Sequence, residues 1–137
     1  MREAVGGSLL LYIIIPIIIL FIVFIGFVMR YASTYRAANY VVTQLENCQG
    51  KMDNCGGTNM EGITQVIKKD YGYITPDVAP NTGGIVRPVC IPNNRDDGRS
   101  GVVYRVELPV EFDLPFFGSI RWMIVKAETK TIQDATC

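Results

Sequence analysis

The four cysteines are the residues of this sequence whose chemistry is easiest to interpret. Cys48, Cys55, Cys90 and Cys137 form an even set that lies wholly in the later part of the chain. In a small domain, an even set of cysteines is typical of disulfide bonds formed in an oxidising space. Cys48 and Cys55 bracket a turn-rich hexapeptide, which favours a local bridge there and a second bridge from Cys90 to Cys137. Four cysteines allow three pairings, and the other two stay open.

Other chemistry finds few suitable residues. Histidine is absent, which removes the commonest metal ligand and the usual proton-transfer group near neutral pH. Zinc bound by the cysteines is the competing reading, but their spacing is irregular and contains no CxxC pair. Asp96-Asp97-Gly98 suggests calcium, although two adjacent aspartates beside two arginines better describe a solvated hairpin tip.

The remaining charges favour neither an enzyme nor a polyanion-binding protein. Thirteen basic residues balance thirteen acidic ones along the 137-residue chain, so no basic footprint for nucleic acid is expected. Glu107 and Glu111 fall on the expected wet face of a strand, where carboxylates usually serve solvation. We therefore expect no catalytic residues, no metal ion, no cofactor and no small-molecule substrate.

One uncharged apolar run, Leu9–Met29, dominates the first part of the chain. At 1.5 Å per residue a helix over this run is about 31 Å long, enough to cross a hydrocarbon core of about 30 Å. A cleaved signal sequence would have a shorter apolar core followed by a small-residue cleavage site. A buried core helix would need a larger protein around it. The run therefore predicts a membrane span, with Pro16 as a kink or a locally melted turn.

The topology of this span follows from the cysteines better than from the flanking charges. Arg2 is offset by Glu3, while Arg30 and Arg36 follow the other end, so the charge bias is weak. If the cysteines are paired, the later part of the chain faces an oxidising space. We expect a short leader at 1–8, a span at 9–29 and an extracytoplasmic domain at 30–137, with the N-terminus in the cytoplasm.

The domain after the span is expected to be α+β. An apolar stripe beyond Arg30 predicts that the first helix continues into the domain, at Ala32, Tyr35, Ala38, Val42 and Leu45. Thr58 and Glu61 have capping-box spacing at the start of a second helix that buries Ile63, Val66 and Ile67 and ends near Tyr71-Gly72. A short strand over Val89–Ile91 precedes the turn at Asp96-Asp97-Gly98.

An antiparallel hairpin is expected near the end of the chain. Inward apolar residues alternate with polar ones from Tyr104 to Leu114, and again over Met123, Val125 and Ala127. Pro109 cannot donate to a ladder, so it should lie at an edge or a bulge. An aromatic cluster near the turn is either core or an exposed contact patch, and core filling is favoured: Phe116, Phe117, Ile120 and Trp122. The fold expected is a long helix packed on a small, disulfide-braced antiparallel sheet.

Two stretches of the chain resemble the TadE-like pilins and pseudopilins of tight-adherence (Flp-type, type IV-like) pilus systems. They are GGSLLLYIIIPIIILFIVFIGFVMRYASTYRAANYVVTQLE and YRVELPVEFDLPFFGSIRWMIVKAETKTI. The first is similar to that family's small-residue start, apolar run with an early proline and polar helical continuation. The second is similar to its closing hairpin. The family carries a glutamate near the start of the apolar run, where Leu10 stands here, and Glu3 lies further upstream.

The resemblance implies a structural subunit of an extracellular, adhesive filament, assembled through the N-terminal helix with copies of itself or related pilin subunits. Membrane lipid would surround the helix before assembly. The expected helix-packing residues are Leu9, Pro16, Ile18, Gly26 and Ala32, and Gly6-Gly7-Ser8 is a candidate processing site. The alternative is a permanently membrane-anchored extracytoplasmic binding module that does not polymerise.

Overall fold

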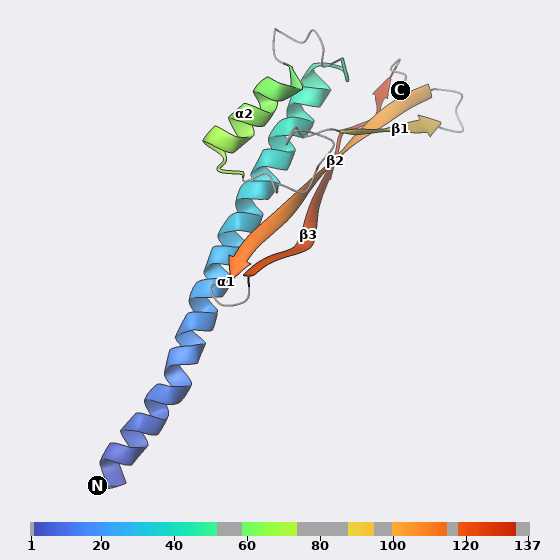
Figure 1. The fold of residues 1–137 in the computed structure, drawn as a ribbon. Helices are drawn as coiled ribbons and strands as arrows, with labels where there is room; N and C mark the ends of the chain where they lie inside the picture. Colours follow the sequence, from blue (N-terminus) through green and yellow to red (C-terminus); the bar gives the residue numbers. More distant parts are fainter. Residues whose placement is uncertain (1, 52–58, 74–87, 95–99, 115–117, 134–137) are drawn as a thin grey trace.

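The computed structural model describes residues 2–51, 59–73, 88–94, 100–114 and 118–133 (Figure 1). These residues form the helices α1 (Arg2–Asn47) and α2 (Met60–Asp70) and the strands β1 (Val89–Asn94), β2 (Ser100–Leu114), β3 (Gly118–Glu128) and β4 (Ile132–Gln133). The strands make one antiparallel sheet in the order β1-β2-β3, and β4 pairs with the start of β2. The expected α+β fold, a long N-terminal helix with a small antiparallel sheet, is confirmed.

α1 is a single helix from the N-terminal end into the domain, and among the described residues its contacts with the domain include Gly26, Phe27 and the part of the helix that follows (Figure 1). Helical conformation continues through Pro16, so of the two alternatives predicted there the locally melted turn is wrong, and the kink stays a prediction. A proline removes one backbone donor, and the helical hydrogen bonds on either side of it still hold the rod together.

The later half of α1 contributes one buried face to the core. Ala38, Val42 and Leu45 are buried as predicted, whereas Ala32 and Tyr35 are exposed, so the predicted stripe is wrong at its start. The buried face instead follows three- and four-residue steps from Thr34. The core combines α1, α2 and the inner face of β2 and β3: Ala37, Ala38, Val41, Val42, Leu45, Ile63, Ile67, Tyr73, Val106, Leu108, Val110 and Val125.

α2 begins one residue later than the predicted capping box. The N-cap is Asn59, whose side chain accepts a hydrogen bond of 2.9 Å from the Gly62 backbone N–H. Because Asn59 occupies the N-cap position, where asparagine is as favourable as threonine, the predicted Thr58–Glu61 capping box is wrong. Thr58 itself lies outside the described residues. Ile63 and Ile67 are buried and Val66 is half-buried. The predicted end is confirmed, with Tyr71 as the C-cap and Gly72 at φ 62°.

β2 and β3 form the predicted antiparallel hairpin, with Val106, Leu108 and Val110 turned to the core. β1 contains the predicted strand over Val89–Ile91 and extends to Asn94. It pairs with β2 over Ser100–Arg105, and among the described residues no strand pairs with the rest of β2 on that edge. Pro109 lies on that edge, and the register shifts between Val110 and Phe112. The prediction of an edge or a bulge at Pro109 is confirmed.

Candidate membrane and assembly surface

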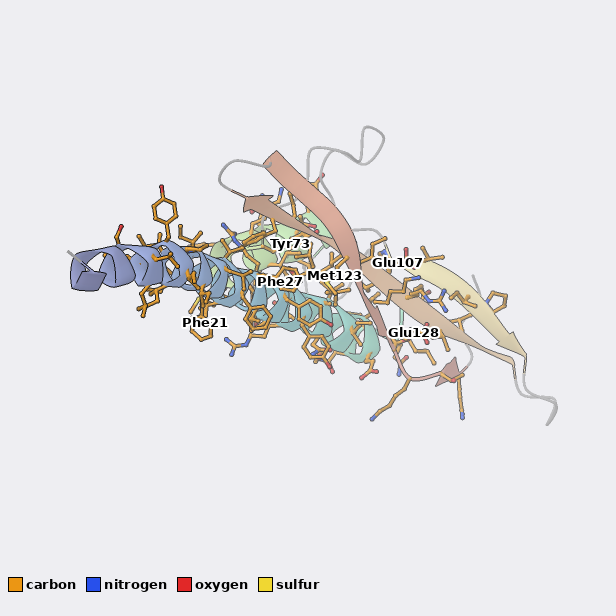
Figure 2. The ribbon with its side chains drawn as sticks, turned by 90° about the horizontal axis from the view of Figure 1, so that it is seen from below. Phe21, Phe27, Tyr73, Glu107, Met123 and Glu128 are labelled. Carbon is orange, nitrogen blue, oxygen red and sulfur yellow. The ribbon has the colours of Figure 1, made fainter. Side chains whose placement is uncertain are left out.

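Most apolar side chains of the first half of α1 are exposed and are not covered by the described part of the domain. Ile18 and Leu20 expose 51% and 69% of their surface, and the other large apolar side chains from Leu9 to Phe24 are exposed as well, except the half-buried Val23. Figure 2 shows Phe21 projecting from the bare part of the helix. The most apolar 18-residue window has a mean hydropathy of 3.2, and none of it is buried. Helices that are apolar all round belong in a core or in a membrane.

This helix has the length and composition of a single membrane span. Among the described residues it is the one helix that meets both criteria. An N-terminal signal sequence meets the same criteria, so they fix the apolar character of the segment and not its topology.

The predicted assembly residues lie along this rod and do not gather at one point. Leu9, Pro16, Ile18 and Ala32 are exposed. Gly26 is half-buried, because the ring of Phe112 from the same chain covers one side of it. The candidate processing residues lie in the first turns of α1 and are exposed, with no neighbouring atom within 4 Å of a Cβ built on either glycine: Gly6, Gly7 and Ser8.

The domain first touches α1 inside the apolar run and not after it. The rings of Phe27 and Phe112 meet edge to face, with centroids 5.9 Å apart and planes at 86°. A Cβ on Gly26 would lie 3.5 Å from Cε2 of Phe112, an ordinary van der Waals contact. The alternation in β2 predicted that Phe112 points inward. Its contact with Gly26 and Phe27 had no signal in the sequence, since it depends on how far the hairpin reaches along the helix.

A polar junction sits just beyond this contact and joins α1, the end of α2 and the edge of β2 that carries Pro109. Ser33 Oγ donates to the carbonyl oxygen of Tyr71, and Tyr73 Oη donates to that of Pro109 at 3.3 Å. Burial of Tyr73, and to a smaller extent the negative charge of Glu111, raise the pKa of Tyr73 to about 12. Glu111 was expected on the wet face. It is half-buried and lines a small hollow with Tyr73, Arg30 and Thr34, because the bulge in β2 displaces it.

The opposite end of α1 is tied to the sheet by a tight turn. Cys48 donates its backbone N–H to Gln44, and Gly50, at φ 75°, donates to Leu45. A Cβ on Gly50 would lie 2.5 Å from the ring of Tyr104, so the turn requires a glycine. The Glu46 carboxylate accepts a hydrogen bond of 2.8 Å from the Lys130 backbone N–H.

Two of the four cysteines, Cys48 and Cys90, are described and lie at this end of the domain. Cys48 is the first residue of the turn after α1. Cys90 lies in β1 opposite Tyr104 of β2, and the ring of Tyr104 packs on that turn. Neither Cys48 nor Cys90 is a free thiol. Cys55 and Cys137 lie outside the described residues, as do Phe116, Phe117 and the candidate calcium turn at Asp96-Asp97-Gly98. The side chains of Ile120 and Trp122 are also outside the described set, so the alternatives for the aromatic cluster stay predictions.

The outer face of the sheet carries ion pairs between facing strand positions. Arg105 Nε lies 2.6 Å from Glu128 Oε1, and Lys126 Nζ lies 3.3 Å from Glu107 Oε1. Both pairs join residues that are partners in the β2–β3 register. Glu107 is therefore on the wet face, as predicted, and is paired there with a lysine.

No family model matches the chain, and no curated protein or solved structure matches it either.

Proposed function

We propose that the chain is a structural subunit of a pilus-like extracellular filament, held in the cytoplasmic membrane by Leu9–Met29 and then assembled through the same helix. One observation carries the proposal: half of α1 is an apolar rod that the chain's own domain leaves bare (Figure 1). The domain packs on the later half of α1 and would coat the filament surface.

The bare rod needs an apolar environment that another molecule supplies. Removing one Leu, Ile or Phe side chain from water contributes about 1.5–3 kcal/mol. Large apolar side chains stand exposed in almost every turn from Leu9 to Phe24. A bilayer satisfies them before assembly. A bundle of like helices satisfies them afterwards, and the exchange costs little in hydrophobic terms because both surroundings are apolar.

The proposal includes disulfide bracing of the exported domain, with Cys48 joined to Cys55 and Cys90 joined to Cys137. The first bridge would hold the turn that ends α1, and the second would tie β1 to the C-terminal end of the chain. Such bridges form in an oxidising compartment, which implies a cytoplasmic N-terminus and an external domain. Neither Cys48 nor Cys90 is a free thiol, which supports disulfide bonding at these two positions without choosing their partners.

The resemblance to TadE-like pilins supports the same reading. A long helix with a bare apolar half and a hairpin domain on its other half fits the two stretches of sequence that carry the resemblance. The departure at Leu10 concerns the residue that the family associates with processing and subunit register. Subunit register in this chain must therefore be set by other contacts.

An aspartate in the middle of the rod tests the filament proposal. Ile18→Asp places a charge where a packed helical core must bury it, at a cost of about 2.5–3.5 kcal/mol on membrane-insertion scales. We expect the yield of filaments sheared from cells, counted by electron microscopy, to fall at least tenfold.

Two matched variants complete this experiment. Ile18→Leu keeps the apolar surface, and Asn39→Asp adds the same charge to an exposed position of α1 beyond the span; both should assemble normally. Filaments formed by Ile18→Asp at the normal yield would overturn the proposal. Wild-type protein that stays in the membrane fraction without any filaments would instead show a permanently anchored binding module.

A further inference from the structure

The end of the β2–β3 hairpin lies at the depth of the apolar run of α1. Phe112 contacts Gly26 and Phe27, both of which precede the end of the run at Met29. At 1.5 Å per residue, Gly26 lies about 4–5 Å inside that end. β2 and β3 remain paired beyond Phe112, through Asp113 with Ser119 and Leu114 with Gly118.

The part of α1 that precedes the hairpin contact is too short to span the hydrocarbon core of a bilayer by itself. The run that the hairpin leaves free, Leu9–Ile25, is only about 26 Å long as a helix, and the hydrocarbon core is about 30 Å thick. When the whole run Leu9–Met29 is placed in the bilayer, the paired end of the hairpin reaches the edge of the apolar layer.

Among the described side chains on the outer face of the hairpin, the ion pairs lie far from this end and the exposed Ile124 lies nearer to it. At the far end its outer face carries the ion pairs Arg105–Glu128 and Glu107–Lys126. Nearer the turn, Pro109 pairs with Ile124, which is 55% exposed, and the neighbouring Met123 is 44% exposed. Figure 2 shows Glu107 and Glu128 farther along the sheet than Met123. Water favours the ion pairs, and a lipid interface favours the exposed Met123 and Ile124.

We propose that the α1-proximal end of the β2–β3 hairpin, with Phe112, Met123 and Ile124, inserts into the interfacial layer of a phospholipid bilayer as a second membrane contact. This contact sets the height and tilt of the domain above the membrane. The proposal rests on α1 spanning the bilayer, which is the membrane-resident stage of the proposed function, and it does not depend on filament formation.

The single tryptophan, Trp122, reports on this contact, because it lies in β3 between Arg121 and Met123. The full chain is reconstituted into phosphatidylcholine vesicles, and insertion of α1 is checked by flotation with the vesicles after a carbonate wash. Trp122 emission is then measured with lipids brominated near the headgroup and with aqueous iodide. We expect at least twofold stronger quenching by the brominated lipid than in vesicles of the same lipid without bromine, together with weak quenching by iodide.

Two substitutions at positions of nearly equal exposure test whether the effect is specific to the end of the hairpin. Ile124→Asp places a charge at the proposed contact, and Val89→Asp places one at a 54% exposed position of β1. We expect Ile124→Asp to halve the quenching by brominated lipid while the chain still floats, and Val89→Asp to leave it unchanged.

The outcomes distinguish this proposal from the proposed function. A chain that floats while Trp122 is quenched by iodide and not by brominated lipid overturns the hairpin contact and leaves the span intact. A chain that does not float overturns the span and the hairpin contact together. Equal lipid quenching in all three proteins overturns the role of Ile124. The wild-type measurement decides the contact even if Ile124→Asp does not fold.

Discussion

The two halves of α1 belong to one continuous helix and lie in opposite surroundings. Leu20 exposes 69% of its surface, whereas Leu45 exposes none. The later half is apolar on one face, which α2 and the sheet cover. The earlier half is apolar all round, and the described part of the domain covers it near its end, where Phe112 meets Gly26 and Phe27. Both halves are helical, and what separates them is the environment that each requires.

The difference between the two halves of α1 indicates which of its side chains stabilise the folded domain. Side chains that the domain covers contribute to its folding, and side chains on the bare rod contribute to whatever surrounds the rod. Substitutions of the same type in the two halves should therefore act on different measurements. The following predictions are ordered from the largest expected effect to the smallest.

The largest contrast is expected between two leucines of the same helix. Leu45→Ala removes a fully buried side chain and leaves a cavity, which should lower the free energy of unfolding of the domain by about 2–5 kcal/mol. Leu20→Ala should change it by less than about 0.5 kcal/mol, because the domain does not cover that residue. Urea unfolding in detergent micelles, followed by circular dichroism, measures both. Equal losses in the two variants would break the comparison.

Tyr73 tests the junction where the domain first closes over α1. Its pKa is raised to about 12 in the folded chain, against an unfolded value near 10. As the pH rises, Tyr73 loses its proton in the unfolded chain before it does in the folded chain. The free energy of unfolding should therefore keep its full value below pH 10 and fall between pH 10 and 12, by up to about 1.4 kcal/mol per pH unit. Urea unfolding at successive pH values measures the slope.

The matched variants for this slope are two tyrosine removals. Tyr73→Phe also loses the hydrogen bond to Pro109, for about 0.5–1.5 kcal/mol at neutral pH, and should remove most of the alkaline loss. Tyr71→Phe should retain that loss. If stability falls equally steeply in both variants, the raised pKa of Tyr73 is not its cause.

The smallest effect is expected on the outer face of the sheet, which meets water in both proposed states. Glu128→Gln removes the partner of Arg105 in a solvent-exposed ion pair and should cost about 0.2–1 kcal/mol, less at high salt. Glu107→Gln, which frees Lys126, should behave alike. A loss above about 2 kcal/mol in urea unfolding would mean that this face is covered by another part of the assembly.

Patterns within one element were enough to predict much of the fold. The alternation around Val106, Leu108 and Val110 predicted which face of β2 is buried, and the missing donor of Pro109 predicted its place at an edge or a bulge. The apolar run predicted a helix whose surface the domain does not cover.

Features set between elements were not predictable in the same way. Tyr35 has the right spacing for the buried stripe of α1, but the direction from which the sheet approaches leaves it exposed. The bulge after Val110 draws Glu111 toward Tyr73, and neither residue signals the other in the sequence. The contact of Phe112 with Gly26 depends on the reach of a whole hairpin along a helix. The periodicity of a sequence predicts which face of a helix or strand is buried, but not where along a neighbouring element it packs.

A cryo-electron-microscopy reconstruction of filaments sheared from cells tests most directly whether the bare half of α1 forms a filament core. We predict that Ile18 and Leu20 lie inside the filament, in van der Waals contact with α1 helices of neighbouring subunits, and that the β-sheet lies at the outer surface. A filament with these side chains at its outer surface would contradict this account, as would cells that hold the chain in their membranes and form no filament from it.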